Sequence, residues 1–295
     1  MAIRFSEHIE AAPGKLPVDA HDEKELEMKR LHFTCKVAVA LCLLLATMDG
    51  YARESKAEYT PKTWQAGKDV IWVPTPQVVV DTMLDMAKVT SSDYVIDLGS
   101  GDGRIVIGAA KRGATALGIE YNPDMVELAR RAATEEGVAA RATFEKADIF
   151  ESDFSKATVI TMYLLTSLNL KLRPKILDMK PGTRIVSNNF DMEDWQPDQR
   201  ITFTESNLWN TAYLWIVPAK VDGIWQLDKG QINVTQKFQY INGTLTTMGK
   251  DMAFSGKLDG DKISFTAGDR EYTGTVSGSM ISGTHDGGGS WKATR

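Results

Sequence analysis

One stretch of this 295-residue chain decides its fold: DLGSGDGR, residues 97–104. The apolar run before it is typical of a buried parallel strand, and the apolar residues after it continue into a helix that ends at Arg112-Gly113. In a strand, glycine loop and helix, backbone N–H groups and the helix N-terminus can face a ligand. Because Gly99, Gly101 and Gly103 have no Cβ, the ligand can approach the main chain closely. The stretch therefore predicts a ligand-binding loop in an α/β domain.

Acidic residues also follow the next two predicted strands. Glu120 lies 23 residues after Asp97, at the end of the second strand, where it can accept hydrogen bonds from two ribose hydroxyls. Asp148 follows the third strand and can accept from an exocyclic amine, while Ile149 beside it packs on a purine face. Three acids at successive strand ends indicate a ligand with an amino group, a ribose and an adenine. A dinucleotide fits less well, because Asp97 and Asp102 would repel its pyrophosphate.

Residues 62–217 resemble the class I, seven-strand S-adenosylmethionine-dependent methyltransferases. Three segments are similar to the mitochondrial-type protein-lysine methyltransferases: PTPQVVVDTML (74–84), DLGSGDGRIVIGAAKRG (97–113) and LNLKLRPKIL with KPGTRIVSNNFDMEDW (168–195). The resemblance implies a doubly wound, Rossmann-like sheet of seven strands, closed by an antiparallel hairpin over 201–217. It implies S-adenosyl-L-methionine as the cofactor, with its methionine end on Asp97 and on the glycine loop that includes Ser100. Glu120 would then hold the ribose, and Asp148 with Ile149 the adenine.

Two further residues are candidates for the site. Thr75 lies between Pro74 and Pro76, which hold an extended strip, and the resemblance implies that such a strip folds over the cofactor. Tyr163 follows the fourth predicted strand, which in this fold lies beside the transferable methyl group, so we expect it to line the methyl-transfer pocket. The alternatives are that the strip with Thr75 only caps the following helix and that Tyr163 is only a buried packing residue. The segment lacks the Asn/Asp-Pro-Pro-aromatic pattern of enzymes that methylate nucleobases or glutamine. We therefore expect an amine acceptor, such as a protein lysine, or a small molecule.

The N-terminal segment predicts export. Residues 1–27 are polar and acidic, so we expect them to be disordered or to precede the true start at Met28. Residues 28–52 have the parts of a signal peptide: basic residues, an apolar run over 37–46 and a small-x-small cleavage site that ends at Ala52. This pattern predicts a periplasmic or secreted chain without a membrane span after cleavage. An uncleaved N-terminal membrane anchor is the alternative.

Composition narrows the possible chemistry. The net charge of −5 and the pI near 5.5 provide no electrostatic footprint for nucleic acid. Both cysteines, Cys35 and Cys42, lie in the signal segment, so the exported chain would have no disulfide, thiolate metal site or cysteine nucleophile. The lone histidine of the C-terminal segment, His285, has no second ligand at metal spacing, and we expect no metal site.

The composition changes again from residue 218, where glycine and threonine increase and short alternating runs replace helical periodicity. We expect a methyltransferase domain over 53–217 and a small antiparallel β-barrel or meander over 218–295. Asn242-Gly243 is the strongest hairpin signal in this region. Two other functions stay open: a non-catalytic exported binding protein that retains the methyltransferase fold, and a nicotinamide-dependent enzyme.

Overall fold

The computed structural model describes residues 25, 27–30, 32, 59–204 and 211–295. The contacts within the chain define two units, 1–58 and 59–295. The predictions for the N-terminal segment, including the cleavage site and both cysteines, lie outside the described residues. Among the residues that are described, no helix is long and apolar enough to cross a membrane.

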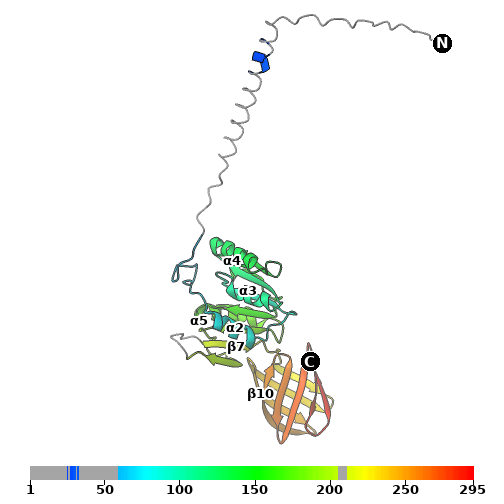
Figure 1. Cartoon of the computed structure of the whole chain (residues 1–295). Helices are drawn as coiled ribbons and strands as arrows, with labels where there is room; N and C mark the ends of the chain where they lie inside the picture. The colour runs from blue at the N-terminus through cyan, green and yellow to red at the C-terminus, as the bar shows by residue number, and fades with distance from the viewer. Residues whose placement is uncertain (1–24, 26, 31, 33–58, 205–210) are drawn as a thin grey trace, which may run out of the picture. The chain divides into compact units, whose positions relative to one another are not determined.

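A seven-stranded sheet forms the first part of the second unit (Figure 1). Its order is β3-β2-β1-β4-β5-β7-β6, and β1 to β5 run parallel, whereas β7 is antiparallel to both β5 and β6. The strands are β1 (Tyr94–Leu98), β2 (Thr115–Glu120), β3 (Ala142–Lys146), β4 (Val159–Met162), β5 (Arg184–Asn188), β6 (Gln199–Thr202) and β7 (Thr211–Ile216). The predicted doubly wound sheet is confirmed, including its closing hairpin.

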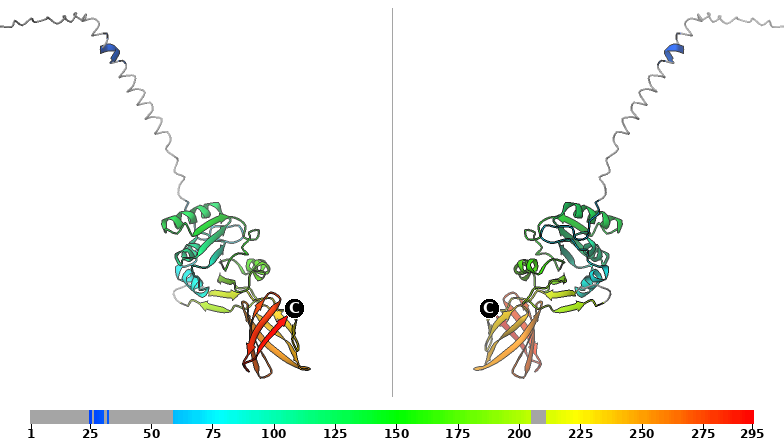
Figure 2. Two further views of the ribbon diagram at one scale, coloured as in Figure 1. Left: turned by 90° about the vertical axis from the view of Figure 1, so that its right-hand side faces the viewer. Right: turned by 90° about the vertical axis from the view of Figure 1, so that its left-hand side faces the viewer.

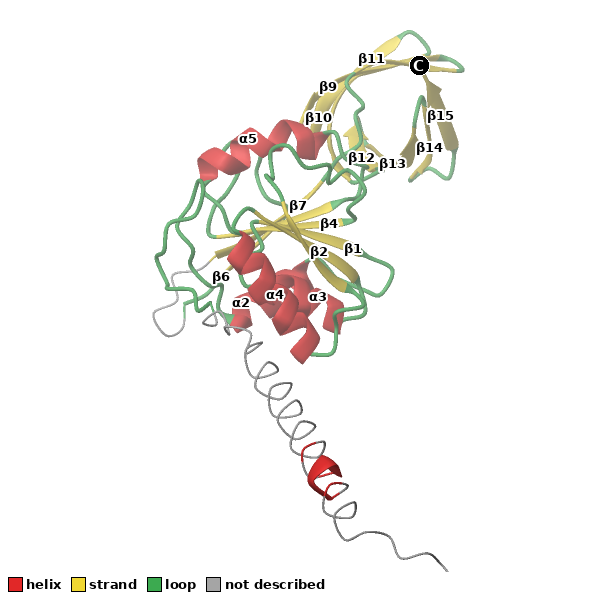
Figure 3. Ribbon diagram, turned by 90° about the horizontal axis from the view of Figure 1, so that it is seen from above, coloured by secondary structure: helices red, strands yellow, loops and turns green. Residues whose placement is uncertain are grey.

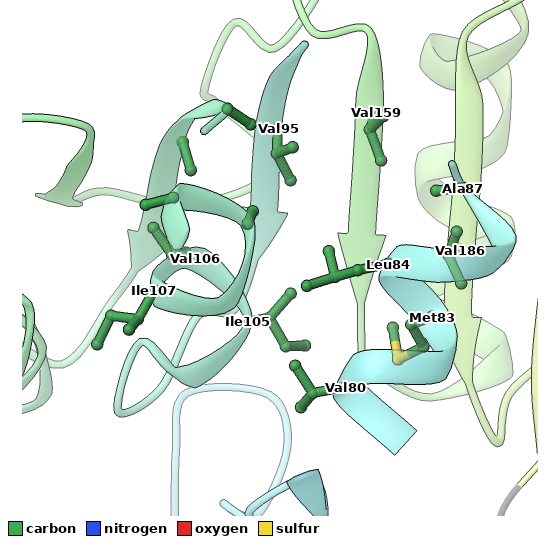
Figure 4. Close-up of a cluster of buried hydrophobic side chains, with 14 of the residues drawn as sticks. Val80, Met83, Leu84, Ala87, Val95, Ile105, Val106, Ile107, Val159 and Val186 are labelled. Carbon is green, nitrogen blue, oxygen red and sulfur yellow. The ribbon is translucent and has the colours of Figure 1, made fainter. Parts of the chain in front are cut away.

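Helices cover both faces of this sheet, as Figure 3 shows. One face carries α2 (Gln77–Met86), α3 (Arg104–Lys111) and α4 (Pro123–Glu135), and the other carries α5 (Thr166–Leu177). Figure 4 shows how apolar side chains of α2 and α3 meet over three valines of β1, β4 and β5. Burying both faces of a parallel sheet explains why the central strands β1 and β4 are buried almost throughout, whereas the outer strand β3 is not.

The glycine loop and the Asn-Pro turn start α3 and α4 in different ways. Gly103 is the N-cap residue of α3, with φ 83°, a left-handed conformation that favours glycine. Asn122 caps α4 by accepting a hydrogen bond from the Asp124 N–H, and Pro123 occupies the first helical position. These two helices therefore begin directly after β1 and β2, which places their N-termini at the carboxyl edge of the sheet.

Eight antiparallel strands form the C-terminal part and close into a barrel, drawn from yellow to red in Figure 2. They are β8 (Gly223–Leu227), β9 (Gly230–Lys237), β10 (Tyr240–Thr247), β11 (Lys250–Asp259), β12 (Lys262–Ala267), β13 (Arg270–Ser277), β14 (Met280–His285) and β15 (Ser290–Thr294). The predicted barrel is thus confirmed. Its interior is filled by side chains that include Trp225, Phe254, Phe265 and Tyr272.

The predicted hairpin turn at Asn242-Gly243 is wrong. Both residues lie inside β10 and pair with residues of β9 and β11. The turns at the two ends of β10 are formed by Phe238-Gln239 and Met248-Gly249. A Cβ on Gly243 would lie 1.8 Å from the Asn233 carbonyl oxygen and 2.8 Å from carbons of the Phe254 ring. Close packing inside the barrel, and not a turn, therefore requires the glycine.

Candidate active site

A pocket lies at the carboxyl ends of β1 to β4, where open α/β sheets bind ligands. Nine of the predicted site residues line it: Thr75, Asp97, Gly99, Ser100, Gly101, Glu120, Asp148, Ile149 and Tyr163. Gly103 is the exception, because it packs below the loop, where a Cβ would lie 2.7 Å from the Phe144 ring. The hydroxyl of Ser100 lies against Gly118 of β2. The structure thus brings together residues that the sequence spreads from 75 to 163.

Asp97 is the most deeply buried acid of the pocket, with 2% of its surface exposed. Its carboxylate Oδ1 accepts a hydrogen bond of 2.7 Å from the hydroxyl of Thr161 on β4. Burial raises the pKa of Asp97, and the nearby Glu120 and Asp102 add to the shift, whereas the hydrogen bond from Thr161 opposes it; together these effects bring the pKa to about 7. A positive charge brought into the pocket would favour the ionised carboxylate.

Glu120 holds the glycine loop against the end of β2. Its Oε2 accepts from the Gly101 N–H at 3.0 Å, and its Oε1 accepts from the Asn122 N–H at 2.9 Å. A carboxylate has about four lone-pair positions, so both oxygens can still accept from hydroxyl groups. Glu120 thus lines the pocket with acceptor positions left for hydroxyl groups, and its role at a ribose stays a prediction.

Asp148 is held from two sides in this structure. Its Oδ1 accepts from the Phe150 N–H at 2.9 Å, and its Oδ2 forms an ion pair with Lys68. The Lys68 ammonium also lies 4.9 Å from the centre of the Tyr121 ring. Hydrogen bonding to Lys68 lowers the pKa of Asp148, and the same bond raises the pKa of Lys68. An adenine amine at Asp148 must therefore share the carboxylate with Lys68.

A strap of residues 64–76 covers one side of the pocket. It folds back on itself through an isolated bridge between Ala66 and Ile71. Trp72 presses its indole on the glycine loop so closely that a Cβ on Gly101 would lie 2.7 Å from the indole nitrogen. Arg104 links the strap to the glycine loop. Its Nη1 donates to the Thr75 carbonyl at 2.6 Å, and its Nε donates to Asp102 at 3.0 Å.

Three contributors to the pocket were missed by sequence reasoning: Lys68, Trp72 and Arg104. Trp72 and Thr75 belong to the same proline-rich strip, so the strip itself was a usable signal for both. Arg104 closes the glycine stretch, where a basic residue two positions after Asp102 allows a local ion pair. Lys68 lies 80 residues before Asp148, and nothing in the sequence pattern links the two.

Tyr163 lines the pocket and has aromatic and amide neighbours behind it. Tyr163 follows β4, and its ring centre lies 6.0 Å from that of Phe190. The Asn189 amide is 3.4 Å from the Tyr163 hydroxyl, and Asn189 adopts a left-handed conformation with φ 64°. Asn169 of α5 donates to the carbonyl of Phe190 at 2.9 Å. Residues 189–190 are therefore held next to Tyr163 by both side-chain and backbone contacts.

The charge pattern of the pocket fits S-adenosylmethionine. The amino group and the sulfonium of S-adenosylmethionine are both positively charged. Asp97 is a buried carboxylate, and the described residues around it include no cation that pairs with its ionised form. Glu120 can accept from the ribose hydroxyls, and Ile149 lines the pocket beside Asp148. Within the described part of the chain, no group of three or more histidine, cysteine or acidic side chains is arranged to hold a metal ion.

Comparisons with known proteins identify related methyltransferases. Residues 97–199 match the family described as the ANTKMT methyltransferase domain. A protein-lysine N-methyltransferase of Saccharolobus islandicus (strain REY15A) is 44% identical over 151 residues, 50% of this chain and 94% of that protein. The adenine nucleotide translocase lysine N-methyltransferase of Mus musculus is 35% identical over 105 residues, 35% of this chain and 46% of that protein. The structure of an RNA methyltransferase from Salinibacter ruber with S-adenosyl-L-homocysteine is 48% identical and covers 50% of this chain and 96% of that chain, with a TM-score of 0.48.

Proposed function

This chain belongs to the class I, seven-strand S-adenosylmethionine-dependent methyltransferases, and from that membership we propose that it methylates the side-chain amine of lysine residues in proteins. The cofactor is S-adenosylmethionine. Two of the relatives are named as lysine N-methyltransferases, which favours the same acceptor here.

The observation that carries the proposal is the aromatic acceptor side. Tyr163 lines the pocket, and the Phe190 ring packs against Tyr163 without lining the pocket itself. The two rings would form a wall on which the methylene stem of a lysine packs while its amine points into the pocket. An apolar wall also favours the neutral form of an approaching amine, because desolvation lowers the pKa of a lysine. Only the neutral amine has the lone pair that attacks a methyl group.

The residues of the chain contribute mainly alignment to this reaction. When bound, S-adenosylmethionine supplies an electrophilic methyl group on a positively charged sulfur. Asp97, Glu120 and Asp148, which line the pocket at three different strand ends, would hold three parts of the cofactor and so fix its orientation. Holding both reactants in an aligned geometry removes a large part of the entropic barrier of a displacement. The site therefore needs no strong base on the chain beyond the desolvating wall.

The proposal is tested with radiolabelled S-adenosylmethionine and three fractions from the source cells: protein, RNA and small molecules. We expect label in the protein fraction and methyl-lysine in its acid hydrolysate. The matched control is the same protein fraction after acylation of its lysine amines, in which the label should disappear.

Label in RNA or in small molecules, with none in protein, would refute the lysine assignment. Binding of S-adenosylhomocysteine without transfer to any fraction would instead support the alternative of an exported binding protein. The acidic net charge of −5 argues against a nucleic-acid acceptor.

A further inference from the structure

The β9–β10 turn of the barrel has an unusual backbone. Phe238 adopts φ 53°, in the left-handed region that large side chains rarely occupy. The turn has only two residues, Phe238 and Gln239, between paired strands. A bulky residue persists in such a conformation only when its surroundings determine it. The conformation therefore directs attention to what Phe238 contacts.

Phe238 and Gln239 contact the loop that follows β5 of the methyltransferase sheet. The Phe238 ring stacks on Trp195 with a centre distance of 5.7 Å and an interplanar angle of 17°. Gln239 is fully buried, and its side-chain amide donates to the Gln196 carbonyl at 2.7 Å. Trp195 is also fully buried, so this contact is part of the interior of the protein.

Arg173 of α5 links the same turn and loop. Its Nη1 donates to the Met192 carbonyl at 2.9 Å and to the Asp194 carboxylate at 2.7 Å. Its guanidinium carbon lies 5.3 Å from the centre of the Phe238 ring. A second link lies nearby, where Lys257 of β11 forms an ion pair of 2.7 Å with Asp198 at the end of the loop.

The other end of this loop is at the acceptor side of the pocket. Residues 189–190 begin it, and they contact Tyr163 through the Asn189 amide and the Phe190 ring. The loop thus runs from the wall of the acceptor side to the barrel turn within eight residues, 189–196. The segment between these two ends is also held from the methyltransferase side, where the Trp215 indole donates to the Trp195 carbonyl at 2.7 Å and Asn169 donates to the Phe190 carbonyl at 2.9 Å. Trp195 is thus packed between the sheet and the barrel turn, so loss of the Phe238 ring would remove the barrel half of its support.

We propose that the Phe238-Gln239 turn positions the acceptor wall for methyl transfer, by holding the loop 189–196 from the barrel side. The proposal rests on the function proposed above for the pocket, but it assigns the barrel a part in the reaction. Phe238 is a positioning residue, because it acts through Trp195 and the loop and touches neither the cofactor site nor Tyr163.

The test uses three variants of the full chain. Phe238→Ala removes the stacked ring, and Phe238→Tyr retains it. Met248→Ala is the matched control, because Met248 also occupies a two-residue turn with a left-handed φ of 49°, is 85% exposed and lies at the other end of β10. Three quantities are measured: the Kd for S-adenosylhomocysteine, the kcat on whichever fraction the unaltered chain methylates, and amide hydrogen exchange over residues 189–198.

For Phe238→Ala we expect a Kd within about twofold of the unaltered chain, a kcat at least about tenfold lower and faster exchange in the loop. Phe238→Tyr and Met248→Ala should behave like the unaltered chain. Should Phe238→Ala fail to fold, Phe238→Leu is measured by the same criteria, because it remains apolar but cannot stack.

Three results would overturn the proposal: an unchanged kcat and exchange in Phe238→Ala, a Kd that worsens in proportion to kcat, or an equal loss in Met248→Ala. Amide exchange requires no acceptor, so the anchoring of the loop is decided even if no fraction is methylated. Methylation of RNA would refute the lysine acceptor and leave the positioning role standing. The two proposals can therefore fail separately.

Discussion

The burial of Asp97 predicts that cofactor binding depends on pH near neutrality. With a pKa of about 7, Asp97 is largely protonated at pH 6 and largely ionised at pH 8 when the pocket is empty. A ligand with a positive amino group binds the ionised form, so binding below pH 7 must release the proton. The apparent affinity should therefore fall about tenfold from pH 8 to pH 6, or about 1.4 kcal/mol for the one unit between pH 6 and the pKa.

Ionisation of Asp97 makes the free energy of unfolding depend on pH in the opposite direction to that of an ordinary salt-bridged acid. The folded-state pKa of Asp97 lies above the ordinary value of 3.8 for an aspartate, so between pH 4 and pH 7 the folded chain binds more protons than the unfolded chain. The free energy of unfolding should therefore decrease as the pH rises through that window. As the pH rises toward neutrality, the affinity for the cofactor should therefore increase while the stability of the empty protein decreases.

Calorimetric titration with S-adenosylhomocysteine at pH 6, 7 and 8, in buffers of different ionisation enthalpy, measures both the affinity and the number of protons released. Asp97→Asn should remove the pH dependence and weaken binding at pH 8 by roughly tenfold to hundredfold, from about 1.5–3 kcal/mol for a hydrogen bond to a charged group. Thr161→Val removes the 2.7 Å hydrogen bond that opposes the shift. Its profile should move to higher pH by about one unit.

An affinity of the unaltered chain that is the same at pH 6 and pH 8 would refute this reasoning. No histidine lines the pocket among the described residues, so a histidine of the pocket cannot imitate the expected profile. A profile that persists in Asp97→Asn would show that another group carries the proton.

Other predictions concern the remaining strand ends and the N-terminus. Glu120→Ala should weaken S-adenosylhomocysteine binding by roughly tenfold to hundredfold in calorimetry while the circular dichroism spectrum stays the same; equal affinity would remove Glu120 from the ribose site. Lys68→Ala should speed dissociation of S-adenosylhomocysteine several-fold in stopped-flow traces, because the strap loses its ion pair with Asp148, and it should leave the stability nearly unchanged, since the pair is partly exposed. Mass spectrometry of the native protein should find a chain that begins at Arg53, and a chain that retains the preceding residues in the cytosol would contradict export.

The core of the site could be predicted from sequence because the sheet is parallel. Carboxyl ends of parallel strands meet at one edge, so Asp97, Glu120 and Asp148 had to converge wherever three strands were recognised. The strands that carry Asp97 and Glu120 are mostly apolar, which made their ends easy to place, whereas β3 before Asp148 has only Ala142 and Phe144 buried. The same logic located Tyr163 at the end of β4.

The strap and the barrel turn depend on contacts that have no local signal. Lys68 reaches Asp148 only because the strap folds back at an isolated bridge, which leaves no periodic pattern in the sequence. Phe238 forms a turn against its own backbone preference, so turn chemistry pointed to Asn242-Gly243 instead. In both cases tertiary packing overrides the local preference on which sequence reasoning depends.

Because strands β8 to β15 close on themselves, each of them has a neighbour on both sides, although β15 and β8 pair at only two positions, Ala293 with Leu227 and Thr294 with Gln226. Apart from this short seam, the barrel offers no row of free N–H and C=O groups on which an extended peptide could add a strand. In the described sheets, a longer free edge is present only at the outer strands β3 and β6 of the methyltransferase sheet. Recognition by the barrel must consequently be carried by outward side chains, of which the hydroxyl-rich groove across β11 to β14 presents a dense group: Ser264, Thr273, Thr275, Ser282 and Thr284.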